Sequence, residues 1–193
     1  MALPLTKQVV SKTNETRELQ QELQAIVDEK LLPAAGRMEA ALEKLEHGDY
    51  DELWRTKKLE DSVAAVLSTL GCVAYGKSED HSQWLPKVHW DLASDLKGLD
   101  KDDRAMNDEA FRSLEEHCAS PLPVDQADRL QSTTSACGSR RIAQLIEMWL
   151  LSYKDYATTA RELKPRMIQL QQLQRELQEL GEQLIHKRAQ AGC

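Results

Sequence analysis

The chain is poor in aromatic residues and has no long apolar run. It contains a single phenylalanine among 193 residues, and aromatic side chains make up 5% of the sequence, whereas charged side chains make up 30%. This balance favours long, solvated helices with a modest core over one large globular core. No stretch of 18 consecutive apolar residues occurs, which excludes a membrane-spanning helix, and no signal-peptide pattern begins the chain.

Cysteine and histidine are too scattered to indicate a metal site. None of the four cysteines, Cys72, Cys118, Cys137 and Cys193, forms a CxxC pair, and the five histidines are spread along the chain. Free thiols in a reducing compartment are the expected state of these cysteines. We therefore expect neither a bound metal nor another cofactor.

Catalytic patterns and a net basic charge are also missing. The sequence has no phosphate-binding loop, no GxSxG and no HExxH, so we predict that this chain is not itself an enzyme. Its net charge of −7 argues against nucleic-acid binding, which calls for a basic surface. The acidic cluster at residues 100–103 is interpreted as a solvated helix end.

Helix-favouring segments at the two ends dominate what is present. In the first arm, residues 1–45, apolar side chains recur three and four apart at Leu19, Leu23, Ile26, Met38, Ala41, Leu42 and Leu45. Such a narrow stripe requires a partner helix. Pro33 lies within this segment, where a proline costs about 3 kcal/mol in a regular helix. Because the periodicity resumes directly after it, we predict a kinked but continuous helix.

The second arm, residues 141–193, mirrors the first and contains its own proline, Pro165. Its broad apolar face near the start consists of Ile142, Leu145, Ile146, Trp149, Leu150 and Tyr153. Farther along, the stripe narrows to Leu163, Met167, Leu170, Leu173, Leu177, Leu180 and Leu184. This series lacks one residue of a strict heptad near Leu170, which predicts that several registers have similar energy. We expect Ser139 to cap the helix, and the arms to belong to a longer protein.

Short helices fill the middle segment, residues 46–140. We predict helices over residues 49–57, 59–75, 88–99 and 124–130, and a further helix that begins at Asn107 or Asp108 and ends at Cys118. The apolar face of the second of these is Val63, Val66, Leu67, Leu70 and Val73. The predicted fold class is all-α: an antiparallel two-helix coiled-coil stalk capped by a small globular bundle of about six helices.

Three short segments stand out by their order and spacing. They are a proline with following alanines and leucines and an Asp-Tyr-Asp-Glu-Leu run (Pro33 and residues 40–53), a leucine-rich segment that ends in Asp-Lys-Asp (residues 96–102), and an aromatic and proline series (Trp149, Tyr156 and Pro165). Together they resemble the stalk and microtubule-binding domain of dynein heavy chains, over nearly the whole sequence. The turn at residues 54–59 lacks the family's prolines, so the heavy chain is a divergent one, and its cytoplasmic or axonemal class stays open.

The resemblance implies that the tip binds microtubules through three of its helices. Carried onto this sequence, the binding positions are Trp54, Arg55, Lys57 and Lys58, then Lys87, His89, Lys97 and Lys101, and finally Arg140 and Arg141. It also implies that half-heptad sliding of the arms, with Pro33 and Pro165 as kinks, couples microtubule affinity to a remote ATPase ring. The implied partners are α/β-tubulin, the rest of the heavy chain and an accessory light chain, with no nucleic acid and no membrane, in the cytoplasm and cytoskeleton or the axoneme of a cilium or flagellum.

The charge of the middle segment bears on this expectation. Acidic residues outnumber basic ones there, so attraction to acidic tubulin requires the basic residues to gather on one face, and we predict this clustering. Arg140 and Arg141 stand in the first helical turn of the second arm, where cations oppose the helix dipole. They are either a tolerated solvated pair or residues that face an acidic partner.

Two alternatives remain open at the level of sequence. An all-helical scaffold or adaptor would have the same coiled-coil hairpin, with a partner helix along its arms and no affinity for microtubules. A dynein tip could also bind an accessory protein instead of tubulin, through acidic helices such as residues 108–116.

Overall fold

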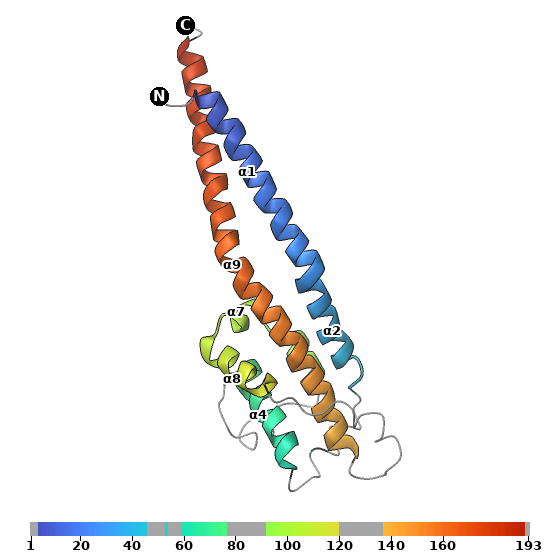
Figure 1. Cartoon of the computed structure of the whole chain (residues 1–193). Helices are drawn as coiled ribbons and strands as arrows, with labels where there is room; N and C mark the ends of the chain where they lie inside the picture. Colours follow the sequence, from blue (N-terminus) through green and yellow to red (C-terminus); the bar gives the residue numbers. More distant parts are fainter. Residues whose placement is uncertain (1–3, 46–52, 54–58, 77–91, 120–136, 192–193) are drawn as a thin grey trace. The chain divides into compact units, whose positions relative to one another are not determined.

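A computed structural model describes residues 4–45, 53, 59–76, 92–119 and 137–191. The regular structure in these ranges is helical, as the sequence predicts, and none of these residues is in a β-strand. The elements are α1 (Leu5–Ile26), the π-helix η1 (Val27–Leu31), α2 (Leu32–Leu42), α4 (Asp61–Tyr75), α6 (Leu92–Lys97), α7 (Lys101–Ala105), α8 (Asp108–Cys118) and α9 (Cys137–Ala191) (Figure 1). None of these helices combines the length and low charge that crossing a lipid bilayer requires.

The first arm continues through Pro33, which confirms the predicted continuity. Helices α1, η1 and α2 follow one another without a break, and Pro33 falls in the first turn of α2. A proline there follows the wider π turn, which gives its ring more room and leaves its missing N–H donor at a helix start, where it costs little.

The π-helix η1 also lies where the burial pattern has one extra residue, between Ile26 and Leu31. Along α1 one stripe of buried or half-buried residues steps by four and three, at Leu5, Val9, Lys12, Thr16, Leu19, Leu23 and Ile26, and half-buried Gln8, Thr13 and Val27 lie beside it. The alternation resumes at Leu31, Ala34, Met38, Ala41 and Leu45. The step from Ile26 to Leu31 is one residue longer than the pattern allows. A π turn accommodates such an insertion within a continuous helix.

Helix α9 runs through Pro165 and keeps a regular stripe, contrary to the predicted gap. One stripe among its buried or half-buried residues steps by four and three, at Leu145, Trp149, Ser152, Tyr156, Thr159, Leu163, Arg166, Leu170, Leu173, Leu177, Leu180 and Leu184, and further buried or half-buried residues flank it, mainly up to Arg161. The prediction for Met167 is wrong, because its side chain is 53% exposed and half-buried Arg166 takes its place in the stripe. An arginine stem covers apolar surface while its head reaches outward, so hydrophobicity alone assigned the wrong residue. Helix α9 begins at Cys137, so Ser139 lies inside it and is not its cap.

The chain divides into two compact units, residues 1–29 with 161–193, and residues 30–160. In the first unit, Lys12 pairs with Glu176 at 2.8 Å and Arg166 pairs with Glu22 at 2.7 Å. From Lys12 to Glu22 the residue number in α1 rises by ten, while that of the partner in α9 falls by ten, from Glu176 to Arg166. The two segments therefore run antiparallel. Both ion pairs flank the same buried stripe and agree on one alignment.

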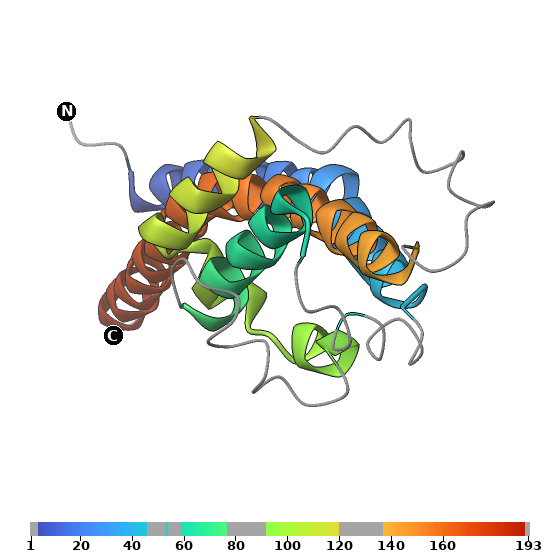
Figure 2. The same ribbon diagram turned by 90° about the horizontal axis from the view of Figure 1, so that it is seen from below.

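The second unit holds the larger core. Helices α4 and α8 pack against each other, and α8 also contacts the N-terminal part of α9 (Figure 2). The broad apolar face predicted for the second arm is confirmed, because all six of its residues are buried. The predicted face of α4 is confirmed in the same way. This unit extends beyond the predicted tip of residues 46–140, since residues 30–45 and 141–160 belong to the same core.

Polar caps and one glycine set the helix ends in this unit. Asn107 caps α8 by accepting a hydrogen bond from the Ala110 amide at 2.9 Å, which confirms one of the two predicted caps. Asp100 caps the separate short helix α7 through the Asp103 amide at 3.0 Å, so residues 100–103 begin a helix that the sequence did not predict. Helix α4 ends at Gly76, whose φ of 61° suits a residue without a side chain. The helices predicted at residues 49–57 and 124–130 fall largely or wholly outside the described residues.

Candidate functional site

Six of the ten predicted microtubule-binding residues, Trp54, Arg55, Lys57, Lys58, Lys87 and His89, lie outside the described residues. The other four can be located, and they fall at two separate places in the second unit. Arg140 and Arg141 are in the first turn of α9, whereas Lys97 ends α6 and Lys101 begins α7.

Arg140 forms an ion pair with Glu60, the residue just before α4. Its Nε donates to both carboxylate oxygens of Glu60 at 3.0 Å, and its terminal nitrogen also donates to Oε1. The hydrogen bond from Arg140 lowers the pKa of Glu60 below its ordinary value. The side chains are 40% and 50% exposed, so the pair connects the starts of α9 and α4 at the surface.

Arg141 contacts the end of the first arm. Its guanidinium donates to the carbonyl oxygen of Lys44 at 3.1 Å, just beyond the last residue of α2. A cation is favourable there, because the last carbonyls of a helix lack partners and carry partial negative charge. The two arginines that oppose the dipole of α9 are therefore compensated by a carboxylate and by the end of a neighbouring helix.

Lys101 lies beside a later part of α9, and Lys97 ends α6. The carbonyl of Lys101 accepts a hydrogen bond from the Tyr153 hydroxyl at 3.3 Å. Tyr153 is twelve residues beyond Arg141, which corresponds to about 18 Å along the helix axis. Lys101 and Arg141 therefore lie apart along α9, and the clustering of the ten residues on one face stays a prediction, since six of them lie outside the described residues.

An aromatic series on α9 holds α7 in place. The rings of Trp149 and Tyr153 stack with centroids 5.1 Å apart, and those of Tyr153 and Tyr156 lie 6.3 Å apart. The Tyr156 hydroxyl donates to Asp102 Oδ1 at 2.6 Å. Burial, then the hydrogen bond and charge of Asp102, raise the pKa of Tyr156 well above its ordinary value. The i, i+4, i+7 spacing indicated a common face, but nothing local indicated Asp102 as the partner.

A buried polar contact that sequence reasoning missed joins α8 to α9. A hydrogen bond of 2.5 Å connects His117 Nε2 and Glu147 Oε2, and the two side chains are 9% and 3% exposed. The available signal was Glu147 itself, a lone carboxylate within the broad apolar face of the second arm. Such a carboxylate requires a buried partner, although the sequence does not show which one.

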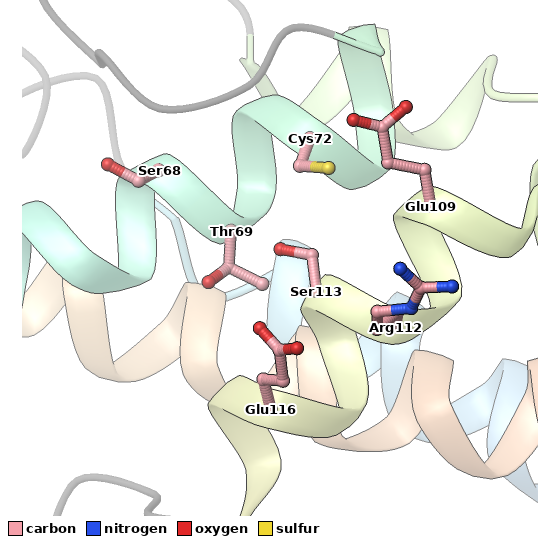
Figure 3. Close-up of a pocket in the computed structure, with 7 residues that line it drawn as sticks. All are labelled: Ser68, Thr69, Cys72, Glu109, Arg112, Ser113 and Glu116. Carbon is pink, nitrogen blue, oxygen red and sulfur yellow. The ribbon is translucent and has the colours of Figure 1, made fainter.

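An open cavity of about 310 Å³ lies between α4 and α8 (Figure 3). Its lining consists of Ser68, Thr69 and Cys72 from α4, and Glu109, Arg112, Ser113 and Glu116 from α8. Hydroxyl, thiol and charged groups therefore meet in one groove. The described ranges hold no group of three histidine, cysteine or acidic side chains placed to bind a metal ion. Cys72 and Cys118 are free thiols, and burial raises the pKa of Cys118.

Comparison with known proteins leaves the chain without an assigned relative. No protein-family model matches it, and no curated protein matches it significantly.

Proposed function

We propose that this chain is the stalk and microtubule-binding tip of a divergent dynein heavy chain, in which the antiparallel α1 and α9 segments form a coiled coil. One observation carries the proposal: two of the segments that resemble the family are joined in the structure. Tyr156 of the aromatic and proline series donates to Asp102, which closes the leucine-rich segment. Tyr153 donates to the adjacent Lys101 carbonyl.

The regular burial stripe gives the proposal further support. A four-three alternation on both α1 and α9, with ion pairs on its flanks, is what a two-helix coiled coil requires. Its apolar layers and matched ion pairs favour one alignment of the arms.

Microtubule co-sedimentation across a salt series tests the function. We expect the full chain to bind microtubules and to lose affinity as salt rises, because tubulin is acidic. Alanine at Arg55, Lys57, Arg140 and Arg141 together should weaken binding by about tenfold or more. Alanine at four exposed cations of the arms, Lys7, Arg17, Lys187 and Arg188, removes the same number of charges and is the control.

A second pair of variants separates binding from folding at Arg140. Arg140→Ala and Glu60→Ala both remove the same surface ion pair, but only the first removes the cation. Binding should therefore fall in Arg140→Ala and be retained in Glu60→Ala. Unchanged co-sedimentation in the four-residue alanine variant would contradict the proposal.

A scaffold or adaptor is the second candidate, and one observation favours it. Met167, Ile168 and Ile185 on α9 are 53%, 55% and 70% exposed, as residues that contact a further helix would be. This function predicts no microtubule binding at any salt concentration, so the same experiment distinguishes the two.

A further inference from the structure

The groove between α4 and α8 lies where α4 has the short side chains of Ser68, Thr69 and Cys72, and where α8 has Ser113 between longer charged side chains. In Figure 3 Thr69 points toward Ser113, whereas the Ser68 hydroxyl points away from it. The fully buried Leu70 and Leu114 fill the core of the same unit. Thr69 is already satisfied within α4, since its hydroxyl donates to the Ala65 carbonyl at 3.1 Å. The two helices therefore leave an open space that is lined by hydroxyl, thiol and charged groups.

The charges around this space are not neutralised by the rest of the described chain. Glu109, Arg112 and Glu116 line it at successive turns of α8, and none of them forms an ion pair with another described residue. Figure 3 shows the Glu116 carboxylate turned toward Thr69 and Ser113, while Arg112 extends toward the Glu109 end of the groove. The Glu116 end thus combines a carboxylate with two hydroxyl groups, which are suitable acceptors for a cationic donor.

We propose that this groove binds an arginine or lysine side chain presented by a helix of a partner protein. A cavity of about 310 Å³ is at the small end of ligand pockets, and its open lining of mixed polar and apolar surface is unlike the apolar enclosure that small molecules prefer. One long basic side chain fits such a space, and a helix laid along the α4–α8 groove can present it. The exposed acids Asp103, Asp108 and Glu115 nearby on α7 and α8 add attraction for a basic partner.

The groove is distinct from the proposed microtubule-binding residues, and the proposal for it does not depend on them. Tubulin is acidic, so an acidic groove disfavours contact with it, and the two surfaces require partners of opposite charge. A failure of microtubule binding would leave the groove proposal intact, and the reverse also holds.

The first test uses a fluorescein-labelled, alanine-rich helical peptide with arginines at positions i, i+4 and i+7, and a matched peptide with glutamates instead. Fluorescence anisotropy with the full chain should detect binding of the arginine peptide only, and the affinity should fall with added salt. The Glu109→Gln/Glu116→Gln double variant should bind at least about tenfold more weakly. Asp95→Asn/Glu162→Gln, which changes two exposed acids outside the groove, should stay within about twofold of the parent chain.

The second test locates the bound peptide. In a Cys118→Ser/Cys137→Ser/Cys193→Ser chain, Cys72 is the single thiol, and it lines the groove. Saturating arginine peptide should slow alkylation of Cys72, whereas the glutamate peptide should not. The proposal is overturned if the arginine peptide does not bind, if both double variants weaken binding equally, or if the alkylation rate of Cys72 is unchanged.

Discussion

The hydroxyl group of Tyr156 makes the closest contact between α9 and the Asp-Lys-Asp segment. It donates to an exposed carboxylate, while its ring stacks on a neighbour and is mostly buried. A hydrogen bond to a charged acceptor in such a place stabilises the fold by about 1–2 kcal/mol. The raised pKa of Tyr156 ties this contribution to pH.

We predict that Tyr156→Phe lowers the free energy of unfolding by about 1–2 kcal/mol at neutral pH. Because the pKa of Tyr156 is higher in the folded state, its contribution is complete below about pH 10 and declines as the pH rises further. The difference between the parent chain and the variant should therefore stay constant up to about pH 10 and shrink as the pH rises above it, as measured by urea unfolding. Tyr153→Phe is the control, and an equal difference at all pH values would contradict the assignment.

His117 and Glu147 offer a test of a buried hydrogen bond. Replacing either residue alone by leucine removes this bond inside the core, which should cost about 1–3 kcal/mol. Replacing both together should cost far less, because well-packed apolar side chains often replace a buried pair without loss. A double-mutant cycle on unfolding free energies measures the coupling. Additive single effects would show that the pair contributes nothing as a unit.

At the scale of the helix, the sequence predicted the features that depend on residues close together in the chain. The extent of α8, its Asn107 cap and the buried face of α4 depend on neighbours within one or two turns, and these predictions are confirmed. The partners of Glu147 and Tyr156 lie 30 and 54 residues away, so no local pattern contains them. The place of Arg166 was missed because its stem packs as an apolar group.

The π-helix η1 has two independent causes that mutation can separate. One is the extra residue between Ile26 and Leu31 in the burial stripe, and the other is Pro33, which follows directly. The insertion is the stronger cause, since a regular α-helix would place the wrong residues in the stripe on one side of it.

We therefore predict that Pro33→Ala retains the wide turn, whereas deletion of Val27 combined with Pro33→Ala converts it to regular α-helix and raises the melting temperature. Deletion of Val27 alone should lower stability by about 3 kcal/mol, because Pro33 would then lie inside a regular helix. Circular dichroism melts and backbone chemical shifts measure both effects. Loss of the π turn in Pro33→Ala alone would identify the proline as its cause.

At the scale of the whole molecule, different contacts stabilise the two compact units. The larger unit depends on a packed core with a few buried polar contacts, among them Tyr156–Asp102 and His117–Glu147. The smaller depends on a thin stripe and two exposed ion pairs, Lys12–Glu176 and Glu22–Arg166. Exposed pairs contribute little stability, but they distinguish one alignment of two helices from others. The alignment of α1 with α9 is therefore the property of this unit most open to change.

The proposed motor function requires that this alignment matter for binding. The two ion pairs join positions whose numbers sum to 188, so Leu170 is the α9 stripe residue nearest in level to Leu19, and a Leu19→Cys/Leu170→Cys disulfide should trap the observed register. A Leu19→Cys/Leu173→Cys disulfide should trap a register shifted by half a heptad, in a chain whose own cysteines are changed to serine. We predict that the two oxidised proteins differ in microtubule affinity by about tenfold, within the usual range of coupling between distant sites. Their reduced forms should bind alike, since reduction lets both return to the same alignment. Equal affinities of the oxidised forms would mean that the arms hold the tip in place without controlling it.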